Sequence, residues 1–406
     1  MIQIKRNNLN VLAEKHYKVF FEKRGYLKKL EKIKENEKND LKKKFLEYLL
    51  ENIEDIIMGN PQCLSRVLKN MNSSNGYIAN KIINNTIVGE QLKEQTDRME
   101  ELLEKQKNLI KGKTYGTVMF DVNKELSNIE LELKSVNDEI KEGKELLELY
   151  KKIEKIFNYD NFTTISKSKN ENTRWDAYEL VKNLKVEVCP YCNRQFTTTV
   201  EPVTGEVGRT RPELDHFYSQ TQYPFFAVSF FNLIPCCHIC NSNLKGSKEF
   251  DVETHLHPYD NELDDLVDFT VKFNEEIDDK DYVNALLHNP QILTIDFKIN
   301  ALKKRQYKRS EFKLLLHKIN NSKRVFKLKT LYNAHTDYVG EIIIKSLLYN
   351  NDSIKSIYKD FPNLFSKKED LLRLVYSNYV DAENMDKRVL AKLTKDIVKE
   401  FGIKNI

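Results

Sequence analysis

Two Cys-x-x-Cys pairs constrain the fold of this chain more than any other feature. They are Cys189 with Cys192, and Cys237 with Cys240. Cysteines three residues apart can present both sulfur atoms on one tight turn, and two such turns supply the four ligands of a tetrahedral zinc site. We therefore expect these four cysteines to bind a structural Zn²⁺. Because a four-cysteine site has no open coordination position, any chemistry must come from other residues.

Composition favours a mainly helical protein in a reducing compartment. The 406 residues include only 6 Cys, too few for a disulfide scaffold, and only 12 Gly and 9 Pro. The sequence starts without an apolar leader, and no apolar run is long enough to span a bilayer. We expect a cytoplasmic protein with no membrane partner. The expected fold class is mainly α with one small α+β module.

The pattern of apolar residues divides the chain into four expected regions. The clearest period runs from Leu126 to Tyr150, where apolar residues alternate at spacings of three and four, as in a coiled coil. A weaker seam precedes it, which predicts an antiparallel hairpin with its tip near 112–118. The regions are an N-terminal helical region (1–88), the coiled-coil hairpin (89–158), the zinc-stapled module (159–260) and a C-terminal mostly helical region (261–406).

Local patterns refine the N-terminal and C-terminal regions. Between Leu9 and Ile57 we expect two helices broken near residues 34–40, followed over 58–90 by a loop-rich connection with a short helix or two. Residues 293–299 alternate as a strand does. Later helices should break at Pro362. The stretch 303–329 carries eleven Lys/Arg and one Asp/Glu, which suits either a phosphate backbone or a solvated helix face.

The residues between the two cysteine pairs carry the candidate chemistry. Asp215 and His216 should lie near the end of a strand over 211–217, which we expect to pair with 195–200 around a turn at Gly205. A carboxylate and an asparagine oxygen, from Asn241 or Asn243, can hold one hard divalent cation, Mg²⁺ or Mn²⁺. Neighbouring strand residues point to opposite faces, so Asp215 and His216 can share a site only if the strand ends or twists there.

A neutral imidazole beside such a cation is suited to removing a proton from water. We expect Asn232 to accept a hydrogen bond from Nδ1 of His216 and to leave Nε2 free as the general base. This combination predicts phosphodiester hydrolysis assisted by one metal ion.

These segments together resemble the HNH endonuclease family, which has a ββα-metal fold. The resemblance rests on four matches in order: Cys189-Pro-Tyr-Cys192, Glu213-Leu-Asp215-His216, Asn232-Leu-Ile-Pro, and Cys237-His-Ile-Cys240-Asn241 followed by Lys245-Gly246. It implies that His216 is the general base, that Asn232 orients it, that Asp215 and Asn241 hold the catalytic metal, and that the cysteines bind structural zinc. Asn241 stands four residues before Lys245 instead of the usual three, which leaves Asn243 as a rival ligand.

Weaker similarities around Trp175 and His257 resemble HNH nucleases of bacterial anti-phage operons, the Septu type among them. That resemblance implies an ATPase partner subunit and DNA as the substrate. Two alternatives stay open at this point. The same site could cut RNA, or the chain could be a nuclease-derived scaffold that binds nucleic acid without cutting it.

Overall fold

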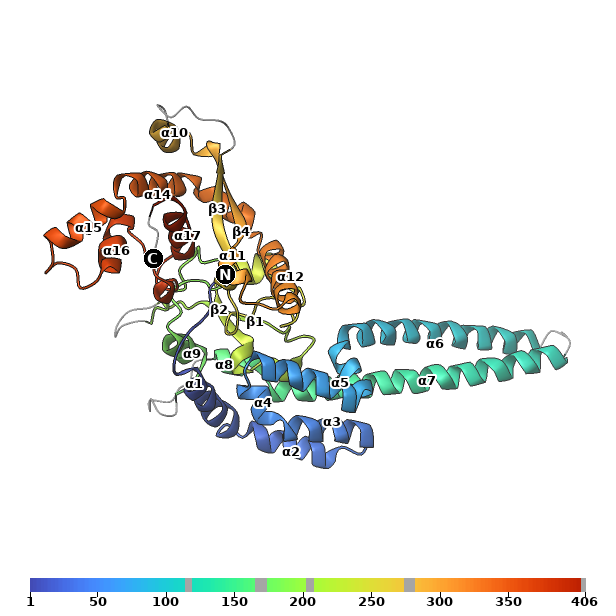
Figure 1. Ribbon diagram of the computed structural model, residues 1–406. Coiled ribbons are helices and arrows are strands. Elements are labelled where there is room, and N and C mark those ends of the chain that lie inside the picture. The colour runs from blue at the N-terminus through green and yellow to red at the C-terminus, as the bar shows by residue number, and fades with distance from the viewer. Residues whose placement is uncertain (114–118, 165–173, 202–207, 274–281, 403–406) are drawn as a thin grey trace.

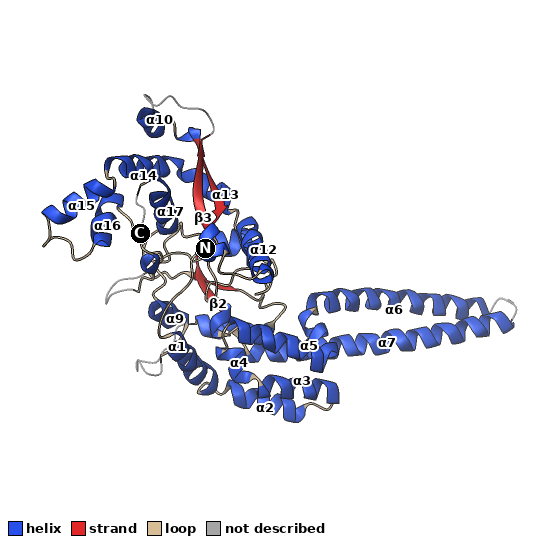
Figure 2. Ribbon diagram, in the orientation of Figure 1, coloured by secondary structure: helices blue, strands red, loops and turns tan. Residues whose placement is uncertain are grey.

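The predicted fold class is confirmed in its coarse form, mainly α with a small amount of β structure, and the β structure consists of small antiparallel sheets (Figure 2). The structure is a computed structural model that describes residues 1–113, 119–164, 174–201, 208–273 and 282–402. A body of helices surrounds the short strands, and one long helical hairpin projects from it (Figure 1). None of the helices in these ranges combines the length and apolar character that a bilayer crossing requires.

The N-terminal region contains more helices than the two expected. The predicted break lies at residues 37–39, between α2 and α3, but the positive φ of Gly25 (76°) adds another before α2. The elements are α1 (Leu9–Lys15), a π-helical segment (His16–Glu22), α2 (Tyr26–Asn36), α3 (Asp40–Glu51) and α4 (Ile53–Met58).

The loop-rich connection predicted over 58–90 is wrong. This segment forms α5 (Pro61–Ile83), with a kink at Asn75, and the start of α6. Asn60 caps α5 by accepting a hydrogen bond from the Cys63 amide, and Pro61 occupies the first turn, where a missing N–H costs nothing. The polar Asn and Ser residues that suggested a loop lie in the helix instead.

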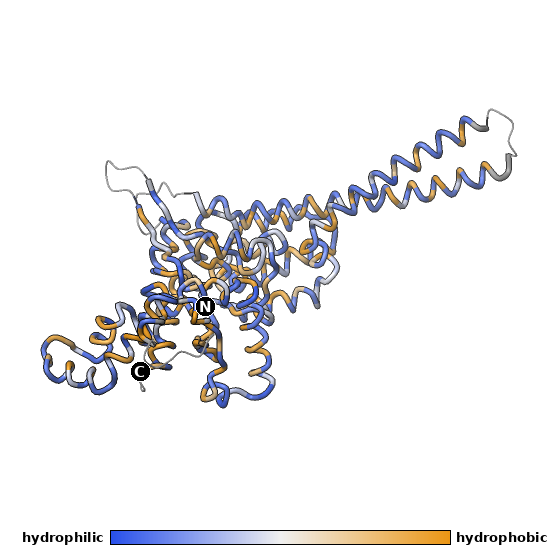
Figure 3. Tube along the Cα trace, turned by 90° about the horizontal axis from the view of Figure 1, so that it is seen from above, coloured by the Kyte–Doolittle hydropathy of each residue, from blue (hydrophilic) through white to orange (hydrophobic). Residues whose placement is uncertain are grey.

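The helical hairpin forms as expected from α6 (Asn85–Lys113) and α7 (Met119–Ile156), which run antiparallel (Figures 1 and 3). Leu102, Val136 and Ile140 form its buried seam. Gly143 lets Leu92 approach closely, since an added Cβ would lie 3.4 Å from Leu92 Cδ1. The predicted tip at 112–118 falls mostly outside the described residues.

Two small antiparallel sheets lie near the centre of the body. β1 (Glu213–His216) pairs with β2 (Leu233–Cys236), with Asp215 opposite Ile234. The predicted pairing of 195–200 with 211–217 is therefore wrong. Among the described residues, isolated bridges join Val200 to Thr210 and Phe196 to Val188, and the predicted turn at Gly205 lies outside the described residues. β3 (Val267–Phe273) pairs with β4 (Leu293–Ile299), which confirms the strand predicted at 293–299.

The C-terminal region is largely helical, as predicted, and Pro362 follows the end of α15. Its helices are α10 (Tyr282–His288), α11 (Ala301–Lys304), α12 (Arg309–Val325), α13 (Leu328–Tyr332), α14 (Thr336–Leu348), α15 (Asn351–Asp360), α16 (Lys368–Tyr376) and α17 (Ala391–Phe401). Earlier short helices are α8 (Tyr159–Thr163), α9 (Ala177–Leu184), and the 3₁₀ turns η2 (Pro224–Phe226) and η3 (Phe230–Asn232).

Segments from the N-terminal and C-terminal regions both contact the first cysteine turn. The Ile2 amide donates to the carbonyl of Pro190, and the Leu390 amide, just before α17, donates to the carbonyl of Asn193. The Tyr332 hydroxyl donates to the carbonyl of Cys192 at 2.6 Å. Segments far apart in the sequence thus share one core with the cysteine turns. Trp175 is fully buried in this core.

Candidate active site beside a four-cysteine metal site

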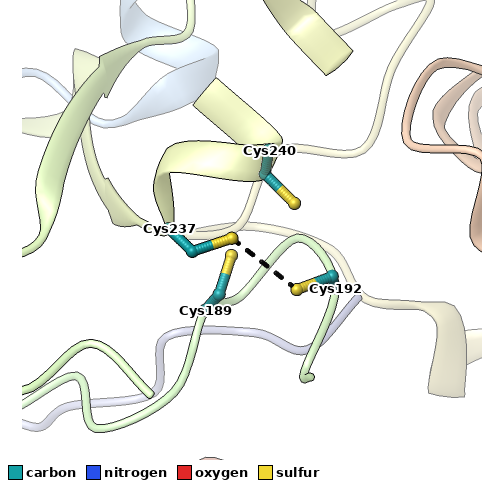
Figure 4. A group of neighbouring side chains, drawn as sticks. All are labelled: Cys189, Cys192, Cys237 and Cys240. Carbon is teal, nitrogen blue, oxygen red and sulfur yellow. Dashed lines mark hydrogen bonds between the residues drawn. The ribbon is translucent and has the colours of Figure 1, made fainter. Parts of the chain in front are cut away.

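The four paired cysteines converge on one point (Figure 4). Their sulfur atoms all lie within 4.8 Å of one another, and Cys192 Sγ lies 3.9 Å from Cys237 Sγ. Zinc–sulfur bonds of ~2.3 Å give a tetrahedron with edges of about 3.8 Å, so the cluster has the size that Zn²⁺ requires. The predicted four-cysteine cluster is confirmed, and zinc is the metal that its ligands suit best.

Backbone geometry shapes the first cysteine turn. Asn193 has a left-handed backbone (φ 50°), and its amide donates to the carbonyl of Cys189 at 2.8 Å. The next amide, of Arg194, points at Cys192 Sγ at 3.4 Å. Asn193 is fully buried, and its side-chain amide donates to the carbonyl of Met385. The turn is therefore held by the C-terminal region as well as by its own backbone.

Beside this cluster lies a cleft of about 380 Å³ that contains most of the predicted site residues. Asp215, His216 and Asn241 all line it. β1 ends at His216, so both members of the Asp-His pair reach the same cleft although they are strand neighbours. The cleft wall consists of Tyr159, Arg211, Glu213, Leu214, Asp215, His216, Ser219, Gln220, Thr221, Asn241, Lys245, Gly246 and Ser247.

His216 is held by a backbone carbonyl. Its Nε2 lies 2.9 Å from the carbonyl oxygen of Ala227, and its ring packs edge-on against Tyr159 with centroids 4.5 Å apart. Burial lowers the pKa of His216 to about 4, so the ring is neutral at pH 7. With Nε2 donating to Ala227, Nδ1 is the nitrogen left to accept a proton, the reverse of the predicted arrangement.

Asn232 does not make the predicted contact with His216. It is fully buried, and its Oδ1 accepts from the Tyr218 amide at 2.7 Å. Its Nδ2 donates to the carbonyls of Tyr218 and Phe226. Asn232 thus clamps the loop between β1 and β2, and the residue after Phe226 is Ala227, the partner of His216. Any effect of Asn232 on the histidine passes through this loop.

Asp215 is already paired with a cation. Its Oδ1 lies 2.8 Å from Lys245 Nζ, its Oδ2 accepts from the Tyr191 hydroxyl at 2.5 Å, and both Asp215 and Lys245 are buried. Lys245 Nζ also donates to the carbonyl of His216 at 2.6 Å. Burial raises the pKa of Tyr191 well above its ordinary value, which keeps it a proton donor.

Asn241 belongs to the segment that carries the second cysteine pair. This segment, η4 (Ile239–Lys245), is π-helical, and the Gly246 amide donates to the carbonyl of Asn241 at 2.7 Å. A π turn accommodates one extra residue, which explains the unusual spacing between Asn241 and Lys245. Asn241 lines the cleft, whereas Asn243 is exposed and does not line it.

Glu213 organises this segment. Its carboxylate accepts from Asn241 Nδ2 at 2.8 Å, from Ser242 Oγ at 3.1 Å and from His238 Nδ1 at 2.6 Å. Burial raises the pKa of Glu213, but these hydrogen bonds outweigh burial and hold the pKa below its ordinary value. The carboxylate of Glu213 is thus held by hydrogen bonds from three residues of the second cysteine segment.

Sequence reasoning missed Tyr159. This residue follows the long hairpin, and burial raises its pKa to about 12. A lone tyrosine after a helix gives no local signal of a site, so only the fold reveals it. Arg211, a half-buried residue near Tyr159 in the cleft wall, also packs on the ring of Tyr178.

The basic stretch 303–329 reaches the site through the ring of Phe326, which contacts Tyr191 and Phe250. Phe326, just after α12, stacks on Tyr191 with ring centroids 4.4 Å apart. Tyr191 is the hydroxyl donor to Asp215. The exposed basic side chains of the stretch are Lys304, Arg305, Lys308, Arg309, Lys313, Arg324, Lys327 and Lys329.

Comparison with known proteins gives one partial similarity. The chain is 36% identical over 75 residues to Protein ea31 of Escherichia phage lambda, which covers 18% of this chain and 21% of that protein. The chain thus matches only about a fifth of the length of this curated relative. No protein-family profile matches the chain, and no solved structure matches it.

Proposed function

We propose that this protein is a metal-dependent endonuclease of the HNH type that hydrolyses phosphodiester bonds of DNA. One observation carries the proposal: Asp215, His216 and Asn241 line a single cleft beside the four-cysteine cluster. A neutral histidine, a carboxylate and an amide oxygen in one cleft are the groups that metal-assisted hydrolysis of a phosphodiester needs.

His216 is the proposed general base. Ala227 fixes the ring through Nε2, so Nδ1 takes the proton from the attacking water. Arg211 is the proposed contact to the phosphate, since a guanidinium matches phosphate oxygens well.

Asp215 and Asn241 are the residues that would hold a divalent metal, Mg²⁺ or Mn²⁺. The donor set fits such an ion because both side chains offer oxygen atoms. The ion would supply charge stabilisation at the phosphate. For Asp215 to act as a metal ligand through Oδ1, the contact of this oxygen with Lys245 Nζ must give way to the metal ion.

That same ion pair favours a second candidate, a nucleic-acid-binding scaffold that does not cut. The buried Lys245 already compensates the charge of Asp215, as expected in a site that has lost its metal. The exposed lysines and arginines of 303–329 would then provide binding without cleavage.

A cleavage assay separates these candidates. Purified protein with its cysteine site filled is incubated with plasmid, single-stranded DNA and total RNA in Mg²⁺ or Mn²⁺. Divalent-dependent cutting of DNA supports the proposal, cutting of RNA alone changes the substrate, and binding without cutting of either supports the scaffold.

The resemblance to Septu-type nucleases extends the proposal to anti-phage defence with an ATPase partner subunit. Purification from the native host through a tag on this chain, followed by mass spectrometry and an ATPase assay of the co-purifying proteins, tests that extension. A stoichiometric complex supports it, and recovery of this chain alone contradicts it.

A further inference from the structure

A second cleft adjoins the proposed catalytic cleft. It has a volume of about 460 Å³, and it shares Arg211 and Glu213 with the first cleft. Its other walls come from residues 195–198 and from the start of the second cysteine pair. The guanidinium of Arg211 therefore stands at the border between the two clefts.

Two large apolar side chains line this second cleft and are exposed. Phe196 is 59% exposed and Ile239 is 36% exposed. The backbone of Phe196 is fixed by a bridge to Val188 beside the cysteine turn, so the ring extends from a rigid base. An exposed aromatic ring on a rigid base is the usual platform for stacking an unpaired nucleobase.

Polar groups complete the second cleft. The exposed hydroxyls of Thr198 and Thr210 line it, and they can donate and accept hydrogen bonds at a base edge. Glu213 would repel a phosphate, but its carboxylate oxygens are already engaged by hydrogen bonds from His238, Asn241 and Ser242. The cleft thus suits a flat, partly apolar ligand with a polar edge, and Arg211 lies where the attached phosphate would be.

We propose that this second cleft binds an unpaired nucleobase next to the scissile phosphate, with the base stacked on Phe196. This inference rests on the proposed nuclease function, because it places the neighbouring phosphate in the cleft of His216. It predicts that the preferred substrate is single-stranded or locally unpaired DNA, since a base within a duplex cannot reach Phe196.

A tryptophan reporter tests the proposal directly. Trp175 is the only tryptophan of the chain and is fully buried, so Phe196→Trp adds one exposed reporter. Binding is measured with short single-stranded oligonucleotides and with a blunt duplex. The His216→Ala background prevents cleavage without a chelator that would strip the cysteine site. We expect the oligonucleotides to quench the fluorescence of Phe196→Trp, and the duplex to quench it far less.

Affinity provides the second readout. Phe196→Ala should weaken single-strand binding about tenfold, and Phe196→Tyr should restore it. Phe361→Ala, which changes a 54% exposed phenylalanine at the end of α15, serves as the matched control and should have no effect. Equal affinities of Phe196→Ala and the parent protein for the oligonucleotides would overturn the inference. It would also be overturned if Phe196→Ala lost binding to a protein ligand but kept its binding to DNA.

The outcomes distinguish this inference from the proposed function. If the wild-type protein cuts DNA and Phe196→Ala cuts it with unchanged KM and kcat, the nuclease stands and the base subsite fails. If oligonucleotides bind through Phe196 but nothing is cut, the subsite stands and the nuclease fails. If no oligonucleotide binds but the wild-type protein cuts plasmid, the base subsite alone fails, and absence of both binding and cutting overturns both.

Discussion

Lys245 Nζ lies 2.8 Å from Oδ1 of Asp215, and both side chains are buried. A cation of the protein itself thus occupies one oxygen of the carboxylate that is proposed to hold the catalytic metal. The aromatic ring of Phe250, 5.0 Å from Lys245 Nζ, lies on another side of this ammonium. A metal ion and Lys245 must therefore compete for Asp215.

The competition predicts a metal-dependent change in stability. Lys245→Met should lower the free energy of unfolding by about 3–5 kcal/mol, because it leaves the buried carboxylate of Asp215 without a cation. Mn²⁺ should restore part of this loss and raise Tm more in Lys245→Met than in the wild type. Thermal unfolding of each protein with and without Mn²⁺ measures the rise in Tm. Lys248→Met, at an exposed position nearby, is the control, and identical Mn²⁺ responses in all three proteins would contradict the competition.

The cysteine cluster predicts one zinc ion per chain. Cys237→Ser should lose that zinc and lower the free energy of unfolding by about 4 kcal/mol or more, because metal binding there contributes to folding. Metal analysis and chemical denaturation measure both quantities. Cys236→Ala changes the buried neighbour outside the cluster and should keep its zinc. A full zinc content in Cys237→Ser would exclude Cys237 as a ligand.

The cysteine pairs and the coiled-coil seam were predictable from sequence because each rests on a short, regular spacing. The seam stays regular along α6, but α7 continues past α6 and packs against the body. There Leu146 and Leu149 are buried, while Leu147, which continues the coiled-coil spacing, is only partly buried. Local spacing cannot anticipate that change of packing partner.

The strand pairing and the ion pair could not be predicted in the same way. The true partner of β1 is Leu233–Cys236, which contains Pro235 and lies beyond a long aromatic loop, so local hairpin rules favoured the wrong neighbour. In the sequence, Lys245 stands out only by its spacing from Asn241. Its pairing with Asp215 depends on how η4 folds back on β1, which no short pattern encodes.

Asn232 should act on stability first and on activity through the loop. Asn232→Ala leaves the Tyr218 amide and the carbonyls of Tyr218 and Phe226 without their partners, at a cost of about 2–4 kcal/mol. Cleavage should fall because Ala227 no longer aligns His216. Urea denaturation and a cleavage assay measure the two effects. Asn243→Ala, at an exposed position, should change stability by less than about 0.5 kcal/mol, and an equally stable Asn232→Ala would contradict the clamp.

Stability should fall in mild acid because of the buried His16. Its Nδ1 accepts from Trp175 Nε1 at 2.9 Å, and its Nε2 donates to the carbonyl of Val228 at 2.7 Å, which requires a neutral ring. Burial lowers the pKa of His16 to about 4, below its ordinary value. As the pH falls, the unfolded chain therefore takes up this proton at a higher pH than the folded protein does. The stabilisation is complete above pH ~6.5 and is lost as pH falls toward 4.

At pH 5 the loss from His16 alone should be about 2 kcal/mol relative to pH 7.5. Urea denaturation at the two pH values measures it. His16→Gln should reduce the pH dependence by that amount, whereas His288→Ala, at an exposed position in α10, should not change it. An unchanged pH dependence in His16→Gln would show that other groups cause the acid sensitivity.

The most direct test of the proposed nuclease is plasmid cleavage in Mg²⁺ or Mn²⁺ by the wild type, His216→Ala and His288→Ala, each with its zinc content verified. The wild type and His288→Ala should convert supercoiled plasmid at equal rates, and His216→Ala should be slower by about 100-fold or more, as expected for loss of a general base. Wild-type rates in His216→Ala, or no cleavage by the zinc-loaded wild type with either metal, would contradict the assignment of this cleft as a nuclease site.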